Sequence, residues 1–240
     1  MNERHDAELF TWVDGKRFFR ELPIVTHTLE IGNTGFLIDG IADAAALLDF
    51  PDYAKRFVED NVAPYGMELW PASKMLAEWV IAERPGRGQE ALELGCGLGL
   101  VSVAAARCGW QVTATDNDPT SIAFARHNAE KNGVQFASTM LLDWNRTLQA
   151  GPFERILAAD VLYERMDHAP LLGCIRQLLA PSGMAAIADP NRRIADSFPE
   201  TAEGLGFQVA VTLAATCNHG GEPVRGRVFR ISPKPMAGLT

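Results

Sequence analysis

The sequence lacks an excess of basic charge and any cysteine pattern. Its 240 residues include 22 Lys and Arg against 30 Asp and Glu, a formal net charge of −8. A protein that holds nucleic acid by its phosphates needs a basic face, so this balance argues against a nucleic-acid partner. The 4 cysteines show no CxxC or other metal-ligand spacing, so we expect free thiols and no bound metal.

A membrane segment is also missing. No run approaches the roughly 18 apolar residues of a membrane-spanning helix, and the N-terminal sequence MNERHDAELF is too charged for a signal peptide. Hydrophobic residues make up 47% and charged residues 22% of the chain, as in ordinary globular proteins. We therefore expect a cytoplasmic protein with a substantial core and no membrane partner.

A glycine-rich loop stands in the middle of the chain, in the sequence LELGCGLGL. Residues 91–94 are mostly apolar and suit a short buried strand, and glycine then occupies every second position: Gly95, Gly97 and Gly99. Glycine lets a backbone turn tightly and approach a ligand closely, where a Cβ would obstruct it. A loop of this kind between a strand and a helix is typical of a nucleotide-cofactor site.

The residues after the loop complete a βαβ unit. Residues 100–107 predict a helix packed on the sheet, and residues 111–115 predict the next strand, which ends in Asp116. A carboxylate at this position can accept hydrogen bonds from both hydroxyls of a ribose.

The spacing of the glycines indicates which cofactor the loop binds. The dinucleotide pattern GxGxxG needs a third glycine, but that position is Leu100 when counted from Gly95 and Ser102 when counted from Gly97. The pattern present is ExGxGxG, with Glu93 at the strand end, where a carboxylate pointing into the site would repel a pyrophosphate. S-adenosylmethionine carries a sulfonium and an amino group and no phosphate, so charge favours it over NAD.

The rest of the chain alternates strands and helices. We expect further helices from Pro71 to Pro85 and at residues 119–131, 171–179 and 198–205, and strands at residues 134–142, 155–159, 184–188, 207–213 and 227–231. The connection between the last two strands is too short for a crossover helix, so these should pair antiparallel. The prediction is an α/β fold: a doubly wound, mostly parallel seven-stranded Rossmann-like sheet with a C-terminal antiparallel hairpin.

The N-terminal residues break this rhythm. Residues 24–41 predict two strands joined around Gly32 to Gly35, and residues 50–65 predict a loop or a short helix. We interpret residues 1–68 as an N-terminal extension packed on a core that comprises residues 69–240.

Polar and aromatic residues follow the predicted strands at the edge where a doubly wound sheet binds its ligand. Asp143 and Trp144 follow the third strand, where a carboxylate can accept from an adenine amino group and an indole can stack on the ring. Asp160 and Tyr163 follow the fourth strand and should face the reacting end of the cofactor. The structural alternatives are a core position for Trp144, and a helix cap plus a buried aromatic for Asp160 and Tyr163.

Three further features have two readings each. Trp70 either covers the cofactor from the side or belongs to the core, and residues 189–192 form either a solvated turn or a substrate contact. Cys96 lies in the glycine loop, and we interpret it as a small residue and not as a nucleophile.

Together these motifs resemble those of the class I, seven-strand S-adenosylmethionine-dependent methyltransferases. The resemblance is greatest to the family-16 group, which includes protein lysine methyltransferases and nicotinamide N-methyltransferase-like proteins. It covers about residues 66–192 and rests on LWPAS, LELGCGLGL, the acidic end of TATDND, LLDW and the DxxY pattern of DVLY. It implies Asp160 and Tyr163 as the catalytic residues near the methyl acceptor. The implied cofactor-binding residues are Trp70, Glu93, Gly95, Cys96, Gly97, Gly99, Asp116, Asn117, Asp143, Trp144 and Ala159.

The acceptor is less defined than the cofactor. Residues 188–192, ADPNR, are similar to the GDPGR-like loop of a branch that acts on the electron-transfer flavoprotein β subunit, but Asn191 departs from that pattern. DVLY stands where aminopurine-targeting methyltransferases have a Pro-Pro motif, which again argues against nucleic acid. The resemblance implies a protein lysine as acceptor. The alternatives are a small amine or N-heterocycle and, against the complete set of site residues, a cofactor-binding scaffold without catalysis.

Overall fold

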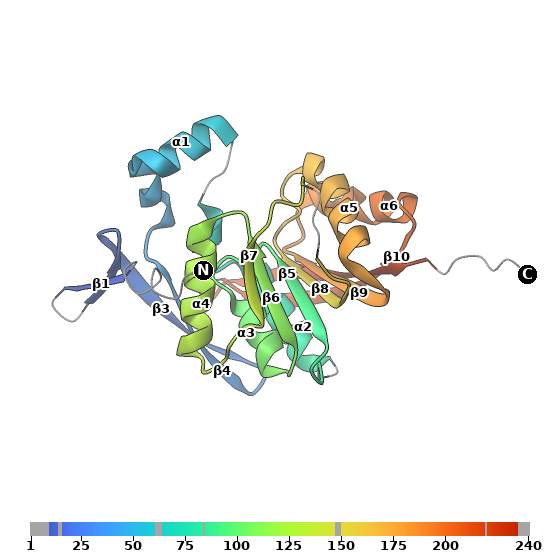
Figure 1. The fold of residues 1–240 in the computed structure, drawn as a ribbon, viewed down its shortest axis with the longest axis horizontal. Helices are drawn as coiled ribbons and strands as arrows, with labels where there is room; N and C mark the ends of the chain where they lie inside the picture. Colours follow the sequence, from blue (N-terminus) through green and yellow to red (C-terminus); the bar gives the residue numbers. More distant parts are fainter. Residues whose placement is uncertain are drawn as a thin grey trace, which may run out of the picture.

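The computed structural model describes residues 10–13, 16–60, 64–83, 85–146, 150–218 and 220–234. A seven-stranded sheet with helices on both faces forms the larger part, and a four-stranded sheet precedes it (Figure 1). The strand order of the larger sheet is β10-β11-β9-β8-β5-β6-β7. Its strands are β5 (Glu90–Leu94), β6 (Gln111–Asp116), β7 (Ser138–Leu141), β8 (Phe153–Ala159), β9 (Leu179–Asp189), β10 (Phe207–Cys217) and β11 (Pro223–Pro233).

The pairing of these strands confirms the predicted fold class. β7, β6, β5, β8 and β9 pair in parallel, and β11 is antiparallel to both β9 and β10. One reversed strand therefore lies in an otherwise parallel sheet. The carboxyl ends of the parallel strands, and the loops that follow them, meet at one edge.

Helices cover both faces of this sheet because its central strands are apolar at successive positions. They are α2 (Pro71–Ala82), α3 (Leu100–Arg107), α4 (Pro119–Lys131), α5 (His168–Leu178) and α6 (Phe198–Gly204). Leu92 of β5 packs in the cluster that contains residues of α5 and α6, whereas its neighbour Ala91 packs with residues of α2 and α3. The alternation of side chains along a strand thus divides the core into two layers.

Several strand boundaries differ from the sequence prediction, and β10 and β11 are both longer than expected. β7 begins at Ser138 and not at Val134. Pro181 to Gly183 do not separate α5 from the next strand, because β9 already begins at Leu179, directly after the helix. The ladder between β8 and β9 shifts register here, so the three residues sit in an irregular stretch of strand.

The N-terminal part forms an antiparallel sheet of β1 (Phe10–Val13), β2 (Lys16–Phe19), β3 (Leu22–Ile31) and β4 (Thr34–Ile41). The two strands expected around Gly32 are confirmed as β3 and β4, and β1 and β2 were not predicted. We expected a loop or a short helix at residues 50–65, and the structure shows a helix, α1 (Pro51–Asp60). Short 3₁₀ helices cover Ala44–Asp49, Tyr65–Met67, Arg165–Asp167 and Arg193–Ser197.

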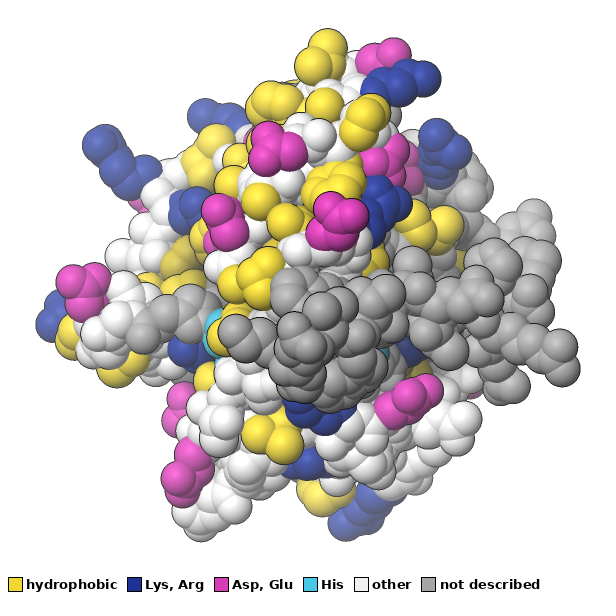
Figure 2. Space-filling view, turned by 90° about the vertical axis from the view of Figure 1, so that its left-hand side faces the viewer, with side chains coloured by type: hydrophobic (Ala, Val, Ile, Leu, Met, Phe, Trp, Pro, Cys, Tyr) yellow, Lys and Arg dark blue, Asp and Glu magenta, His cyan; other side chains and the backbone are white. Residues whose placement is uncertain are grey.

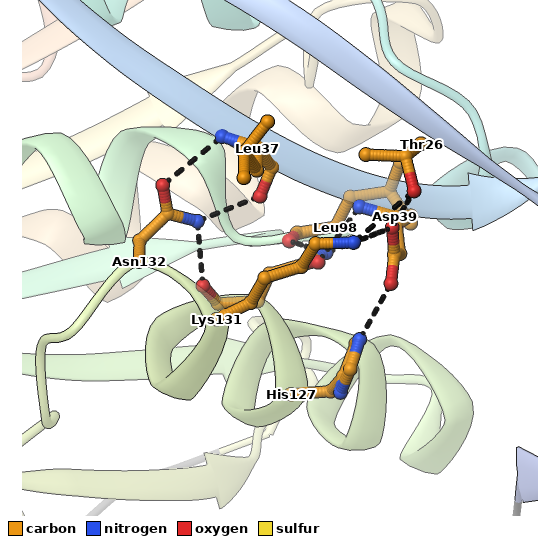
Figure 3. Close-up of polar contacts among 8 residues, drawn as sticks. Thr26, Leu37, Asp39, Leu98, His127, Lys131 and Asn132 are labelled. Atoms are coloured by element: carbon orange, nitrogen blue, oxygen red, sulfur yellow. Dashed lines mark hydrogen bonds and ion pairs between the residues drawn. The ribbon is translucent and has the colours of Figure 1, made fainter.

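α4 holds the N-terminal sheet through side chains that bond to the backbone of β4 (Figure 3). Asn128 accepts from the Asp39 N–H at 2.8 Å and donates to the Asp39 carbonyl at 2.9 Å. Asn132 makes the same pair of bonds with Leu37, at 3.1 and 2.7 Å. An amide side chain can bond the N–H and the carbonyl of one residue, as a neighbouring strand would. The side chains of α4 therefore hold β4 in place, and β4 does not join the larger sheet.

The side chain of Asp39 lies at the centre of this contact. It is 1% exposed and accepts hydrogen bonds from Thr26, His127 and Lys131. Burial alone would raise the pKa of Asp39, but these donors hold it well below its usual value. The N-terminal sheet is therefore attached by a buried, charged contact as well as by apolar packing.

The face of the molecule on the side of α1 mixes hydrophobic side chains with acidic and basic ones (Figure 2). On α1, Phe57 and Val58 are 43% and 82% exposed. Within the part of the chain that the structure describes, no helix is long and apolar enough to cross a membrane.

Candidate functional site

The glycine loop joins β5 to α3, and three of its N–H groups are bonded within the protein. The Cys96 N–H donates to the Thr115 carbonyl at 2.8 Å, and the Gly97 N–H donates to Asp116 Oδ2 at 2.9 Å. The Gly99 N–H donates to the Cys96 carbonyl at 2.7 Å. A pyrophosphate site needs such donors free to point at the ligand. This loop does not offer these three N–H groups to a phosphate.

Glu93 lies beneath the loop and does not point into the site, which corrects the orientation expected from the sequence. It is 1% exposed and accepts from the hydroxyl and the N–H of Ser102, in the first turn of α3. Burial raises the pKa of Glu93 to about 8, and the nearby Asp116 contributes to the rise. A carboxyl with this pKa is largely protonated at neutral pH, so it would not repel a phosphate by its charge. The argument against a phosphate ligand therefore rests on the loop N–H groups that are already bonded. A contact of Glu93 with the cofactor stays a prediction.

Asp116 ends β6 beside the loop, at the position expected for a ribose ligand. Its two oxygens accept from the N–H groups of Gly97 and Asp118, at 2.9 and 3.0 Å. Burial raises the pKa of Asp116 to about 6, although these N–H donors act in the opposite direction. A carboxylate has about four lone-pair sites, so Asp116 retains acceptor capacity for a ligand.

The N-terminal extension reaches the same end of β6. Arg56 of α1 pairs with Asp118 at 3.3 Å and donates to the Asn117 carbonyl at 3.4 Å. The structure thus places α1 next to the predicted cofactor residue Asn117.

Trp144 lies against the loop, and its stacking on the adenine stays a prediction. A Cβ on Gly95 would lie 3.8 Å from the Trp144 ring and 3.2 Å from Val161. Trp144 also packs on the core cluster of β8 and α5, so its two readings are compatible. Asp143 makes local contacts, accepting from the Asn145 N–H at 2.9 Å.

The segment before α2 covers the loop from the other side. Gly97 has a φ of +49°, and a Cβ there would lie 2.9 Å from the carbonyl oxygen of Gly66. The ring of Tyr65 contacts the rings of Trp70 and Tyr163 edge to face, with centroids 6.1 and 6.0 Å apart. The Trp70 Nε1–H donates to the Tyr65 carbonyl at 2.7 Å. Tyr65, which the sequence reading missed, therefore joins Trp70 to Tyr163 in one aromatic row.

Asp160 follows β8, whose last residue is Ala159, and has an unusual conformation and environment. Its φ is +60°, a conformation that non-glycine residues rarely adopt and that clusters at functional sites. Its Oδ1 accepts from Nε and Nη2 of Arg192 at 2.8 and 2.7 Å, whereas its buried Oδ2 has no hydrogen-bond partner. Burial raises the pKa of Asp160 and Arg192 opposes this rise. α5 begins only at His168, so Asp160 is not a helix cap.

Tyr163 is not a buried aromatic, because 39% of it is exposed. Partial burial and the negative charges of Asp167, Glu164 and Asp116 raise the pKa of Tyr163 to about 12. Its hydroxyl therefore stays protonated at neutral pH.

The loop after β9 is held by bonds within the protein, and a substrate contact of residues 189–192 stays a prediction. Asp189 is fully buried and accepts from the Arg192 N–H at 2.9 Å and from Nε of Arg227 at 3.3 Å. The loop is thus a bonded turn that delivers the Arg192 side chain to Asp160. The residues that the structure describes contain no group of three His, Cys, Asp or Glu side chains that could hold a metal ion.

The sequence profile of a family described as lysine methyltransferase matches residues 51–199. The chain belongs to this family. Membership of this family implies the class I fold and S-adenosylmethionine as the cofactor, as the motifs predicted. The structure fits a cofactor without phosphate groups, since three N–H groups of the loop are bonded within the protein and Asp116 ends β6 beside it.

Individual relatives are similar over about half of the chain. The chain is 36% identical over 113 residues to a ubiquinone biosynthesis O-methyltransferase of Methylocella silvestris, covering 47% of this chain and 44% of the relative. It is 30% identical over 122 residues to the histone-arginine methyltransferase METTL23 of Xenopus laevis, covering 48% and 52%. The chain thus spans about half the length of the curated relatives it matches.

Solved structures share the fold. A ribosomal protein L11 methylase from Lactobacillus delbrueckii subsp. bulgaricus has a TM-score of 0.55 at 20% identity, covering 68% of this chain and 79% of that one. A TehB-like S-adenosylmethionine-dependent methyltransferase from Corynebacterium glutamicum has a TM-score of 0.50 at 22% identity, covering 76% and 97%. This lysine methyltransferase family member therefore has the class I methyltransferase fold.

Proposed function

We propose that this enzyme transfers a methyl group from S-adenosylmethionine to the side-chain amine of a lysine in a protein. The observation that carries the proposal is the buried, unpartnered Oδ2 of Asp160, at the sheet edge where the cofactor loops meet. A buried polar atom without a partner is rare in proteins and costs about 1–3 kcal/mol, so its presence here supports a ligand that donates to it.

The residues that would hold the cofactor surround the glycine loop. Asp116 would accept from the ribose hydroxyls, and Asp143 and Trp144 would hold the adenine. The remaining contacts are proposed for Trp70, Glu93, Gly95, Cys96, Gly97, Gly99, Asn117 and Ala159. When bound, S-adenosylmethionine supplies an electrophilic methyl group on a sulfonium, so no nucleophilic protein side chain is required.

The remaining task for the protein is to orient the acceptor amine and to favour its neutral form, which has released a proton to solvent. The amine lone pair then attacks the methyl carbon, and S-adenosylhomocysteine leaves. Asp160 would accept a hydrogen bond from the amine through Oδ2 and so fix its direction. Tyr163 and Tyr65 would line the slot, and desolvation against these rings would lower the pKa of a lysine amine toward the neutral form that can attack. Tyr163 would act as a wall or a donor and not as a base, because its pKa is raised to about 12.

Partly exposed side chains beside Asp160 support a macromolecular substrate, which could cover them on binding. Tyr65, Tyr163 and Met166 are 52%, 39% and 77% exposed. Glu164 and Asp167 lie close enough to raise the pKa of Tyr163. Aromatic residues with acidic neighbours complement a lysine in a basic protein segment.

A small amine or N-heterocycle is the second candidate. A relative at 36% identity over 113 residues is a ubiquinone biosynthesis O-methyltransferase, which favours a small-molecule acceptor but not nitrogen as the methylated atom. The decisive experiment incubates a cell lysate with the enzyme and tritiated S-adenosylmethionine, separates the products by size and hydrolyses the labelled protein. We expect methyl-lysine in the protein fraction with the wild type and none with Asp160→Asn. Label found only in small molecules would move the assignment to the second candidate.

A further inference from the structure

We propose that Arg192 is the positioning and specificity-determining residue of the acceptor site. It occupies one carboxylate oxygen of Asp160 and leaves the other for a single N–H donor, the amine of lysine. The inference rests on the proposed function and gives a chemical reason why the acceptor is lysine and not arginine.

The contact between the two side chains uses only one oxygen. Nε and Nη2 of Arg192 lie 2.8 and 2.7 Å from the same atom, Oδ1 of Asp160. Arginine usually binds a carboxylate with two parallel bonds, one to each oxygen. Here the second oxygen, Oδ2, is buried and unpartnered. The arginine thus fixes the carboxylate and leaves its buried second oxygen for another donor.

A single available oxygen suits an amine better than a guanidinium. The guanidinium is a planar fork that matches two oxygens, and it stays charged at all accessible pH values. A second guanidinium at Asp160 would meet only one oxygen and would lie beside the charge of Arg192. The ammonium of lysine is a compact donor that needs one oxygen and can lose its proton.

The charge of Arg192 also favours the reactive form of the acceptor. An unpaired Asp160 carboxylate would stabilise the ammonium and raise the pKa of the lysine. The guanidinium balances that carboxylate and repels a second cation. With Arg192 in place, the bound amine should therefore become neutral at a lower pH.

The position of Arg192 depends on the C-terminal hairpin. Its N–H donates to Asp189 at 2.9 Å, and its carbonyl accepts from Nη2 of Arg227, on the reversed strand β11, at 3.0 Å. Arg227 also pairs with Asp189 at 3.3 Å and with Asp196 at 2.9 Å. The antiparallel hairpin therefore anchors the loop that carries Arg192.

The test compares Arg192→Gln and Arg192→Lys with the wild type, using tritiated S-adenosylmethionine and lysate protein as probes. Arg193→Gln is the matched control, because it removes the same charge from the adjacent, exposed residue. Melting temperature and the affinity for S-adenosylhomocysteine show whether each variant is folded and binds the cofactor.

We expect Arg192→Gln to reduce turnover at pH 7 at least tenfold while the affinity for S-adenosylhomocysteine changes less than twofold. Its rate should also rise with pH at least half a unit later than that of the wild type, because the bound amine keeps its proton longer. Arg192→Lys should restore part of the turnover and the position of the pH profile. Arg193→Gln should match the wild type.

The outcomes separate the two proposals. Methyl-lysine from the wild type, with an unchanged rate and pH profile in Arg192→Gln, overturns the role of Arg192 and leaves the proposed function. Methyl-arginine from the wild type, or label only in small molecules, overturns both. If Arg192→Gln does not fold, the pH profile of Arg192→Lys decides: a profile identical to that of Arg193→Gln, with full turnover, overturns the role of the guanidinium geometry.

Discussion

Asp116 Oδ2 accepts the backbone N–H of Gly97 at 2.9 Å, across 19 residues of sequence. This bond joins the end of β6 to the loop after β5, so the carboxylate proposed for the ribose and the glycine loop form one unit. A substitution at Asp116 removes a ligand group and also releases the loop, and the two effects must be measured separately.

We predict that Asp116→Ala weakens the binding of S-adenosylhomocysteine by about 1.5–3 kcal/mol, the scale of a lost charge-assisted hydrogen bond. Asp116→Asn should weaken it less, because one acceptor oxygen remains. Isothermal calorimetry checks both, and Asp49→Ala, at an exposed position, is the control. Unchanged affinity in Asp116→Ala would show that this carboxylate is not the ribose ligand.

Asp160→Ala and Tyr163→Phe should lower turnover far more than cofactor affinity, since both residues are proposed to contact the acceptor. We expect about a hundredfold loss for Asp160→Ala, the scale of a misplaced reactant, and about tenfold for Tyr163→Phe. Steady-state labelling gives the rates, and calorimetry with S-adenosylhomocysteine gives the affinity. Wild-type turnover in both variants would remove these residues from the acceptor site.

The βαβ unit and the helix after it could be predicted from the sequence because their signals are local. The residues from Glu90 to Lys131 contain strand, loop, helix, carboxylate and helix cap in order, and the Asp118 side chain accepts from the Thr120 N–H at 2.8 Å, as its capping role requires. The seven-stranded fold followed from the same alternation. The boundary at residue 68 stays a prediction.

The contacts around Asp160 and Tyr163 could not be predicted in the same way, because they join distant segments of the chain. The bond from Arg192 to Asp160 spans 32 residues, and neither residue type indicates a partner in the sequence. Tyr65 has no motif of its own and reaches Tyr163 only through folding. The predicted orientation of Glu93 was wrong, because the sequence places Glu93 at the strand end but does not show which helix covers its side chain.

Glu93 should make stability depend on pH. Its pKa is about 8 in the folded protein against a usual 4.5, so the folded state holds a proton that the unfolded state has lost between these values. The free energy of unfolding should therefore fall as pH rises from about 4.5 to 8. Glu93→Gln removes this titration, so its stability relative to the wild type should rise by about 4 kcal/mol between pH 5 and pH 9.

Chemical denaturation of the cofactor-free protein at pH 5, 7 and 9 measures this difference. Glu90→Gln, at the exposed start of the same strand, is the control and should show a constant offset. A Glu93→Gln offset that is equally constant would mean that Glu93 is ionised in the folded state at neutral pH.

Asp39→Asn should loosen the N-terminal sheet from α4. The substitution removes the charge that pairs with Lys131 and His127, at 2.5 and 2.7 Å, and leaves a buried amide that cannot satisfy both. Removal of one partner from a buried ion pair costs about 3–5 kcal/mol, and we expect about 2–3 kcal/mol here because the Lys131 side chain is 24% exposed.

Hydrogen exchange should show the loss first in β3 and β4, before β5 and β8 lose protection. Glu30→Gln, on β3 but outside the contact that Asp39 makes with α4, should leave both unchanged. If exchange instead rises uniformly across the chain, the sheet and the core unfold as one unit, and the extension is not a separable element that could be exchanged to alter acceptor specificity.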